Sequence, residues 1–417
     1  MRLLAVDTTN TIQGFAWGQD TNGAWVPQAY PQSVSVVAQQ LVHKIGPKTP
    51  GVETTPPTEL TAYVAANGDL GVLDQTGMRV DNHTTTLGTA SRWFDLEWLA
   101  NGTAVLVFSD GSNGKPKFSV RNTSGAWSGD ADVNPSGMPN PATVTWVELE
   151  ANANRTQLSL VFCDNAFDLF AVRFVSGAWQ DPTRLETELH RTTTVGVRNR
   201  PFDTAFESSG ELMVVWARNV ANDHGLFWAT YTNQAWSVPA HYQNALPSGR
   251  SHHVDLAVQP GGDRMVAGLF DLGDMVERVG AGIWNGDSWE DGTELDSQAR
   301  DVEDTALEDW MGAVAMDAQG QALLVYADTV VGDLRYFVND AAGGWTPPAG
   351  VTLVELGLVE SVMLQPMASG MATMMVMTTD AGLLHSAVFR NSQWTNHAVL
   401  PVTTPTNRLP FSFDVRR

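Results

Sequence analysis

The chain has 417 residues, of which 43% are hydrophobic and only 17% are charged, and its formal net charge is −22. This excess of acid argues against nucleic acid or an anionic membrane surface as a partner, because both require a basic footprint. No run of about 18 apolar residues occurs, which argues against a membrane-spanning helix. Cys163 is the only cysteine, so no disulfide can form within the chain, and we expect a small core residue there.

The first residues, Met1-Arg2-Leu3-Leu4-Ala5-Val6-Asp7, are too few and too soon polar for a signal peptide. The composition is poor in lysine, with four in the chain, and rich in Thr, Asn and Trp. We therefore expect an extracellular or cell-surface protein whose leader is absent from this sequence, with a cytoplasmic protein as the alternative.

Tryptophans that follow two small or polar residues recur along the chain. They are Trp25, Trp127, Trp179, Trp236, Trp289, Trp345 and Trp394. From Trp127 onward the spacings are 52, 57, 53, 56 and 49 residues, whereas the 102 residues between Trp25 and Trp127 span two periods. The missing member falls near residues 77–80, where the turn glycine is kept. The spacing predicts eight repeats, with seven as the alternative.

Each repeat contains four short apolar runs separated by Gly, Asn and Asp turn signals. In the fifth repeat these runs are residues 202–206, 212–216, 226–231 and 235–238, which we label strands A to D. Tandem four-stranded units of this length are typical of β-propeller blades. The pattern predicts an all-β protein, a single eight-bladed β-propeller domain spanning residues 1–417.

The two ends of the chain predict how the propeller closes. The N-terminus starts with a strand-B pattern at residues 3–6, so the first repeat lacks strand A. Residues 407–414 resemble residues 199–203, the start of the fifth repeat, and would supply that strand and close the ring. The Pro- and Thr-rich residues 45–58, between strands A and B of the second repeat, are expected to form a surface loop, with a binding or cleavage segment as the alternative.

In a propeller the D–A and B–C loops open on one face, where ligand sites gather. Acidic or amide residues end the B strands there: Asp7 or Asn10, Asp110, Asp164, Asn219, Asp271, Asp328 and Asp380. Such residues end strands by bonding their own backbone, so a turn role is expected, with a cation-binding rim as the alternative. No calcium-loop spacing is present, and we expect no metal and no cofactor.

Basic and aromatic residues cluster just ahead of the A strands. The expected ligand-binding residues are Arg92, Trp93, Arg198, Arg200, Arg250, His252, Trp310 and Arg408. The Arg92/Asp95 and Arg200/Asp203 spacings allow two interpretations. Each arginine could pair with a carboxylate of its own or the adjacent blade and orient the inner strand, or the guanidinium groups could bind an acidic glycan on which Trp93 and Trp310 stack.

His252 and His253 are the best candidates for general acid–base chemistry, with His190 and His224 on neighbouring loops. Adjacent strand residues point to opposite faces, so only one of the pair can face the axis. No nucleophile-elbow or zinc-protease motif accompanies these histidines. The catalytic residues, if there are any, therefore remain unknown. The recurring tryptophans are expected to pack between blades rather than to mark a cofactor.

Two segments, Asn122-Thr123-Ser124-Gly125-Ala126-Trp127 and Asn285-Gly286-Asp287-Ser288-Trp289, stand where sialidase-type (Asp-box) propellers carry Ser-x-Asp-x-Gly-x-x-Trp. The chain resembles those propellers, and the tryptophan-repeat propellers of secreted bacterial proteins, in general pattern. The aspartate at the Asp-box offset is absent. Quinoprotein dehydrogenases also have eight blades with a tryptophan in each, but their docking motif is missing here. The resemblance implies an architecture and no activity.

Two functional hypotheses follow. The first is a non-catalytic recognition or scaffold module that binds a glycan or a protein on the loop-bearing rim. The alternative is a polysaccharide-active enzyme, a lyase or a glycoside hydrolase acting on an acidic glycan. Propellers host both kinds of function, so the fold alone does not decide between them.

Overall fold

A computed structural model describes residues 1–17, 24–28, 36–47, 58–65, 67–81, 83, 85–87, 94–109, 115–133, 143–189, 200–218, 226–242, 251–272, 278–290, 292–296, 312–328, 334–340, 344–347, 349–351, 359–367, 370–405 and 410–414. All regular elements in these ranges are β-strands, in eight antiparallel sheets. Across the same residues, no helix has the length and apolarity needed to span a bilayer.

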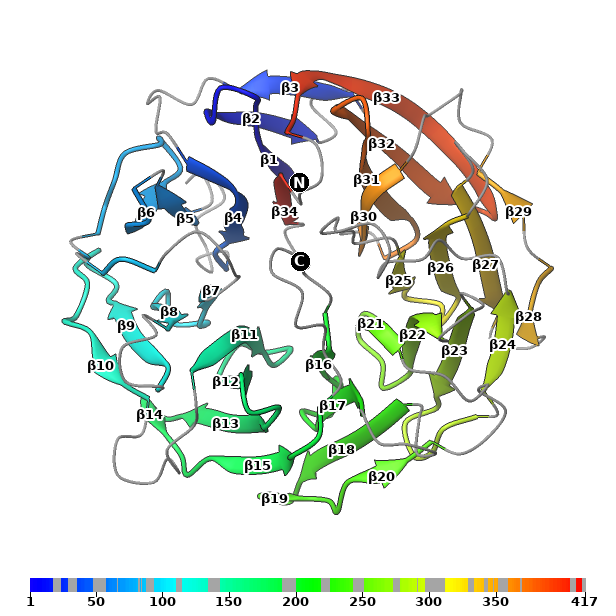
Figure 1. Ribbon diagram of the computed structural model, residues 1–417, viewed down its shortest axis with the longest axis horizontal. Helices are drawn as coiled ribbons and strands as arrows, with labels where there is room; N and C mark the ends of the chain where they lie inside the picture. Colours follow the sequence, from blue (N-terminus) through cyan, green and yellow to red (C-terminus); the bar gives the residue numbers. More distant parts are fainter. Residues whose placement is uncertain are drawn as a thin grey trace. The chain divides into compact units, whose positions relative to one another are not determined.

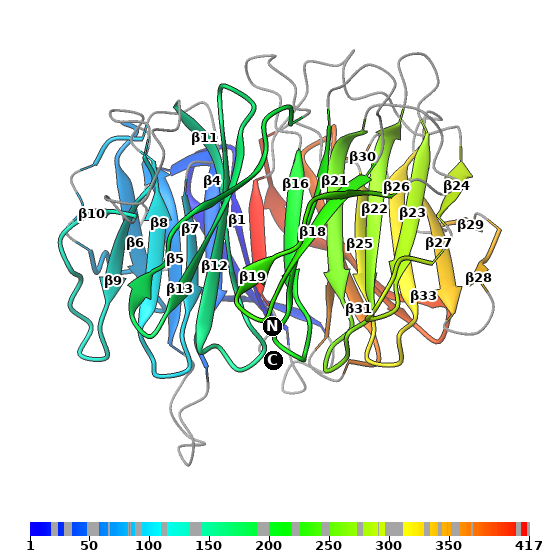
Figure 2. The ribbon, with the colours of Figure 1, turned by 90° about the horizontal axis from the view of Figure 1, so that it is seen from below.

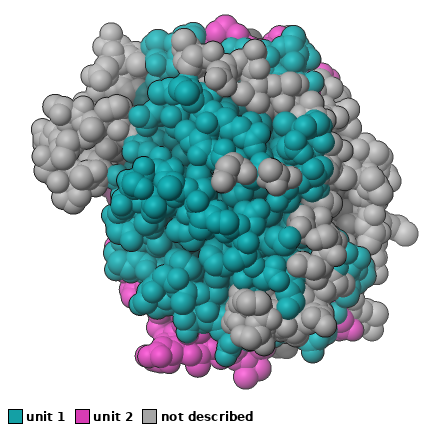
Figure 3. All heavy atoms as spheres, turned by 90° about the vertical axis from the view of Figure 1, so that its left-hand side faces the viewer, with its two compact units in different colours: residues 1–187, 410–417 teal, residues 188–409 magenta. Residues whose placement is uncertain are grey.

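The protein is an eight-bladed β-propeller, as the tryptophan spacing predicts, and the seven-bladed alternative is wrong. Contacts within the chain divide it into unit 1, Met1–Thr187 with Pro410–Arg417, and unit 2, Glu188–Leu409, which are coloured separately in Figure 3. Each unit contains four blades. The single-domain assignment of residues 1–417 stays a prediction.

Unit 1 holds blades 1 to 4 (Figure 1). Blade 1 is β34 (Phe411–Asp414), β1 (Arg2–Val6), β2 (Ile12–Trp17) and β3 (Trp25–Gln28); blade 2 is β4 (Val36–Ile45), β5 (Glu59–Ala65) and β6 (Leu70–Asp74); blade 3 is β7 (Phe94–Trp98), β8 (Ala104–Phe108), β9 (Lys117–Arg121) and β10 (Ala131–Asp132); blade 4 is β11 (Val144–Ala151), β12 (Gln157–Asp164), β13 (Leu169–Val175), β14 (Ala178–Trp179) and β15 (Thr183–Glu186).

Unit 2 holds blades 5 to 8. Blade 5 is β16 (Phe202–Phe206), β17 (Leu212–Ala217), β18 (Leu226–Thr232), β19 (Ala235–Trp236) and β20 (Ala240–His241); blade 6 is β21 (Ser251–Val258), β22 (Met265–Leu272), β23 (Val279–Trp284) and β24 (Thr293–Asp296); blade 7 is β25 (Gly312–Met316), β26 (Ala322–Ala327), β27 (Leu334–Asp340), β28 (Gly344–Trp345) and β29 (Ala349–Gly350); blade 8 is β30 (Val359–Pro366), β31 (Thr373–Thr379), β32 (Leu383–Arg390) and β33 (Gln393–Thr403).

Within each unit the A strands of successive blades contact one another. In unit 1 these contacts run from β34 to β4, β7 and β11, and in unit 2 from β16 to β21, β25 and β30. Each blade's strands run side by side between two ends, as Figure 2 shows. The A–B and C–D turns lie at one end, the A–B side, and the B–C turns at the other, the B–C side.

The C-terminal strand completes blade 1, as predicted. β34 pairs antiparallel with β1, with Leu3 opposite Phe413 and Ala5 opposite Phe411. Both phenylalanines are buried. Burying a side chain of this size contributes about 1.5–3 kcal/mol, so the tail is part of the core of unit 1.

Blade 2 departs from the four-stranded pattern where the repeat has lost its tryptophan. β6 is its last strand, and the Asp81 carboxylate takes the place of part of a D strand by accepting the Val72 N–H at 2.6 Å. His83 is buried against the Trp127 ring of blade 3, 5.5 Å away, and its Nδ1 lies 2.9 Å from Asp130. The main chain also covers the β6 edge, through bonds from the Val80 N–H to the Val72 carbonyl and from the Leu70 N–H to the Thr85 carbonyl, so the edge is not left open to pairing.

Trp179, Trp289 and Trp394 pack between blades, as expected, whereas Trp25 packs on Trp17 and Trp236 on Tyr231 of their own blades. Trp179 meets Phe118 of blade 3 at 5.6 Å, and Trp394 meets Tyr336 of blade 7 at 5.8 Å. Trp289 lies 5.3 Å from Tyr242, which follows the last strand of blade 5. The β4 and β5 strands flank the Pro- and Thr-rich segment with Ile45 opposite Glu59, and residues 48–57 of that segment lie outside the described residues.

Candidate functional site

Most of the predicted rim residues lie outside the described part of the chain. These are Arg92, Trp93, Arg198, Arg250, Trp310 and Arg408, together with His190 and His224. His252 belongs to β21, but its side chain is also outside the description. Their roles stay predictions.

Arg200, ahead of β16, is the predicted rim arginine that the structure describes. Its Nη2 lies 2.9 Å from Asp203 of the same blade, and its Nη1 pairs with Asp255 of blade 6. The guanidinium group is mostly buried, with 18% of the side chain exposed. The first interpretation, an ion pair that joins a blade to its neighbour and orients the inner strand, is confirmed for Arg200.

The aspartates of the A strands serve a repeated structural purpose. Asp203 accepts the Leu256 N–H of the next blade at 2.6 Å, and Asp255 accepts the Val314 N–H at 2.7 Å. In unit 1 the same kind of bond joins Asp95 to Leu149 at 2.8 Å and Asp414 to Ile45 at 2.7 Å. Each carboxylate thereby accepts an N–H from the next A strand, a group that would be costly to bury without an acceptor.

His253, one of the two candidate catalytic residues, lies in the interior of unit 2. Its side chain is 1% exposed, and its ring centroid lies 5.5 Å from that of Phe270. Burial, with the nearby Arg200 charge, lowers the pKa of His253 to about 3. The imidazole is therefore neutral near pH 7.

The aspartates that end the B strands divide into two groups. Asp7 Oδ1 accepts the Thr9 and Thr11 N–H groups, and Asp164 Oδ1 accepts those of Ala166 and Asp168, so the turn role is confirmed for these two. Asp328 instead pairs with the Arg335 guanidinium. Asp380 is exposed, and Asp110, Asn219 and the Asp271 side chain are not described. No group of three or more metal-ligating side chains occurs among the described residues.

One buried group in unit 1 has the order hydroxyl, imidazole, carboxylate. Thr61 Oγ1 lies 3.0 Å from His43 Nδ1, and His43 Nε2 lies 3.9 Å from Glu59. Thr61 is completely buried and His43 is 1% exposed. A nucleophile must be reachable by its substrate. We therefore interpret this group as a polar network of the core.

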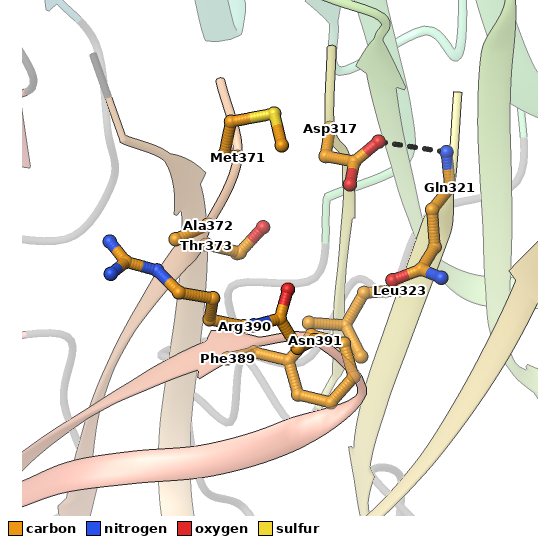
Figure 4. Close-up of a pocket in the computed structure, with 9 residues that line it drawn as sticks. All are labelled: Asp317, Gln321, Leu323, Met371, Ala372, Thr373, Phe389, Arg390 and Asn391. Carbon is orange, nitrogen blue, oxygen red and sulfur yellow. Dashed lines mark hydrogen bonds between the residues drawn. The ribbon is translucent and has the colours of Figure 1, made fainter. Parts of the chain in front are cut away.

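A pocket lies on the A–B side of blades 7 and 8 (Figure 4). It is open to solvent and is lined by Asp317, Gln321, Leu323, Met371, Ala372, Thr373, Phe389, Arg390 and Asn391. Leu323, Ala372 and Phe389 are buried and form an apolar lining, whereas Arg390 and Asn391 are exposed. The Met371 side chain is 48% exposed. The surface that a ligand can touch is therefore mostly polar, with Met371 as its exposed apolar side chain.

Two turns hold the pocket residues in place. Asp317 Oδ1 accepts the Gln321 N–H at 2.9 Å (Figure 4). It also accepts the Gln319 N–H at 2.8 Å, and the two bonds orient the carboxylate. Asn391 and Ser392 form the two-residue C–D turn, with φ of 50° and 58°. Positive φ at both positions matches the turn that suits strand twist in a hairpin.

The two A–B turns also contact each other. Ala318 donates its N–H to the Gly370 carbonyl at 2.8 Å, and a Cβ on Gly370 would lie 2.6 Å from that of Ala318. Sequence reasoning missed this pocket, because it looked for ligands at the B–C side. The sequence shows only a turn at Asp317–Gly320; the pocket itself depends on how blade 7 packs against blade 8.

No family model matches the sequence, and no curated protein is detectably similar to it. Among solved structures, AofleA from Arthrobotrys oligospora aligns with a TM-score of 0.40 and 13% identity over 77% of this chain and 93% of that chain. The Aleuria aurantia lectin, described as a six-bladed propeller with a novel fucose recognition mode, aligns with a TM-score of 0.41 and 9% identity over 89% and 99%.

An enzyme is also among the similar structures. A puromycin hydrolase variant aligns with a TM-score of 0.45 and 11% identity, over 90% of this chain and 57% of that chain. Lectins and a hydrolase thus share this degree of likeness. Similarity at this level supports no assignment of ligand or activity.

Proposed function

We propose that the protein is a non-catalytic recognition module that binds a saccharide in the pocket between blades 7 and 8. The carrying observation is the composition of that pocket. Asp317, Gln321, Arg390 and Asn391 can exchange hydrogen bonds with hydroxyl groups, and the exposed Met371 side chain offers an apolar surface to the C–H face of a sugar. Arg390 suits a carboxylate or sulfate substituent, which is why we propose an acidic glycan.

The pocket is small and open, so the proposed contact is with one end of a glycan. Sites for drug-sized ligands measure roughly 300–1,000 Å³. This pocket spans about 250 Å³ only when the open solvent at its mouth is counted, so we propose that one sugar unit rests on its surface and the rest of the glycan lies outside. An extracellular setting, proposed from the poverty in lysine, would bring the protein to such polysaccharides.

The absence of turnover is part of the proposal. In the described residues, His253 and the Thr61–His43 pair are buried, and neither group lines the pocket. Around the pocket, Asp317 is the one carboxylate and there is no histidine. Glycoside hydrolysis usually requires two carboxyl groups flanking the bond.

The test is a glycan array that includes acidic polysaccharides, followed by titration calorimetry with each glycan bound. Arg390→Ala and Asp317→Asn are expected to weaken binding roughly tenfold to a hundredfold, the value of a hydrogen bond to a charged group. Arg184→Ala is the matched control, because Arg184 is 53% exposed on blade 4 and lies outside the pocket.

Two other outcomes would change the proposal. If Arg92→Ala or Trp93→Ala abolishes binding and the pocket variants do not, the ligand binds at the predicted rim and the pocket assignment is wrong. Release of unsaturated sugars, detected by ultraviolet absorbance, or of reducing ends would show an enzyme and overturn the non-catalytic function. Failure to bind any glycan would reject saccharide recognition.

A further inference from the structure

Three Asn-x-Ser/Thr segments lie in turns on the A–B side of blades 3 and 4. Residues 101–103 (Asn-Gly-Thr) form the turn between β7 and β8, and residues 154–156 (Asn-Arg-Thr) lie between β11 and β12. Residues 122–124 (Asn-Thr-Ser) follow β9 at the C–D turn. This tripeptide is the acceptor pattern for N-linked glycosylation. A fourth copy, residues 82–84, falls partly outside the described residues.

The three turns share one hydrogen-bond geometry. The asparagine Oδ1 accepts the hydroxyl of the residue two positions on, at 2.7 Å from Thr103, 2.7 Å from Ser124 and 2.6 Å from Thr156. The backbone N–H of the same residue also donates to this Oδ1, at 3.0, 3.0 and 3.2 Å. The amide oxygen is thus held toward the protein.

The amide nitrogens are available at the surface. Asn101, Asn122 and Asn154 are all exposed, and among the described residues their Nδ2 atoms make no hydrogen bond. A substituent on Nδ2 would therefore displace no contact of the fold. Surface turns of this kind tolerate bulky additions because they carry no core packing.

The three turns also form one continuous patch. Ala100 donates its N–H to the Arg155 carbonyl at 2.8 Å, which joins the first turn to the third. A Cβ on Gly102 would lie 3.8 Å from the Thr123 methyl group, which places the first turn beside the second. Residues from two blades therefore present three acceptor amides on one side of unit 1.

We propose that Asn101, Asn122 and Asn154 are acceptor sites for N-linked oligosaccharides. In the reaction, the asparagine Nδ2 forms a bond to C1 of a sugar carried by a lipid diphosphate. The bond between that C1 and the diphosphate oxygen breaks, the lipid diphosphate leaves, and Nδ2 loses one proton. A cellular oligosaccharyltransferase supplies the catalyst. The proposal is independent of the saccharide pocket, because all three residues lie outside it.

The experiment is to secrete the full chain, behind an added leader, from a eukaryotic cell line and to map its glycopeptides by mass spectrometry with and without peptide N-glycosidase. Each of the three peptides is expected to carry an oligosaccharide. Asn101→Gln, Asn122→Gln and Asn154→Gln should each remove one glycan from the intact mass. The thermal midpoint of the deglycosylated protein should change little, because the Oδ1 bonds that each substitution alters lie in exposed turns.

Asn285 provides a matched control. It is exposed in the C–D turn of blade 6, and its Oδ1 accepts the Asp287 N–H at 3.0 Å, but it has no hydroxyl residue two positions on. Asn285 should stay unmodified in the wild-type chain and gain a glycan in Asp287→Thr. If the secreted, folded wild-type chain carries no glycan at Asn101, Asn122 and Asn154, the proposal is wrong, whether or not the Asp287→Thr chain is modified.

Discussion

The Asp203 carboxylate on β16 accepts a hydrogen bond of 2.6 Å from the main-chain N–H of Leu256 on β21, in the next blade. The same carboxylate accepts the Thr204 N–H at 2.7 Å and pairs with Arg200. A side chain therefore does what a neighbouring strand does inside a sheet: it satisfies an edge N–H. This hydrogen bond joins the inner strands of blades 5 and 6, although the two strands do not pair in a continuous β-sheet.

Removing that carboxylate should destabilise unit 2. Asp203→Ala removes the acceptor of the buried Leu256 N–H and one of the carboxylates paired with Arg200. Breaking a buried charged pair costs about 3–5 kcal/mol of unfolding free energy. Asp203→Asn keeps one carbonyl oxygen and should cost less. Urea denaturation measures both. Asp287→Ala, at an exposed turn, is the control and should change the unfolding free energy by less than about 0.5 kcal/mol; an equal effect of Asp203→Ala would contradict the role given to Asp203.

The C-terminal strand gives a second prediction. Deleting residues 410–417 removes the buried Phe411 and Phe413, together with the bond from the Ile45 N–H to Asp414. Each buried phenylalanine is worth about 1.5–3 kcal/mol, so the deletion should lower the thermal midpoint strongly. A peptide of residues 410–417 added in excess should raise it again, because it can pair with β1. No change on deletion would show that blade 1 does not depend on β34.

The repeat tryptophans differ in what they contact, and their substitutions should differ accordingly. The Trp289 ring packs against Tyr242 of the preceding blade and Trp284 of its own, both within 5.7 Å. Trp236 packs on Tyr231 of its own sheet. Trp289→Ala should cost about 3 kcal/mol, near the lower end for large aromatic residues in cores. Trp236→Ala should cost clearly less, and similar denaturation midpoints for the two variants would contradict inter-blade packing by Trp289.

The spacing of these tryptophans is also the reason that the fold could be predicted. Strand alternation, turn residues and the repeat marker are local signals, and they recur at every blade even where one copy, near residue 78, has lost its tryptophan. The Arg200/Asp203 spacing likewise indicated an ion pair, because both residues lie on one short segment. The sequence left open whether the carboxylate belongs to the same or to the adjacent blade, and Arg200 pairs with one of each, Asp203 and Asp255.

The pocket could not be predicted in this way. Asp317 and Gly370 are 53 residues apart, and neither turn differs from an ordinary surface turn in sequence. They form a site because blade 8 packs against blade 7 closely enough for Gly370 to contact Ala318. Such proximity depends on the volume of all the side chains between two sheets, such as Leu323 and Phe389. That information is not present in either turn.

Stability should fall as the pH drops below about 6.5. Burial lowers the pKa of His43 in unit 1 and of His253 in unit 2 to about 3. At a pH between the folded value and the unfolded pKa of about 6.5, each of these histidines binds a proton in the unfolded chain but not in the folded chain. The free energy of unfolding therefore decreases as the pH is lowered through this range. The loss should be on the order of 2 kcal/mol per histidine by about pH 5. Unfolding free energies of His253→Gln should depend less on pH over this range than those of the wild type, and equal slopes would contradict the buried neutral state.

Gly370→Ala should damage both unit 2 and the saccharide pocket. Gly370 has φ of +64°, and an added Cβ would lie 2.6 Å from the Ala318 Cβ, far inside contact distance, so the A–B turns of blades 7 and 8 must separate.

Gly344 offers a matched comparison, because its φ is +79° and an added Cβ meets nothing within 4 Å. Both substitutions force an L-residue into left-handed backbone, at a cost of about 1 kcal/mol, but Gly370→Ala adds overpacking worth about 1–3 kcal/mol more. The free energy of unfolding, measured by denaturation, should therefore be clearly lower for Gly370→Ala than for Gly344→Ala. Calorimetry should show weaker glycan binding for Gly370→Ala alone. Glycan binding that is equal in the two variants would mean that the turns of blades 7 and 8 do not shape the binding site.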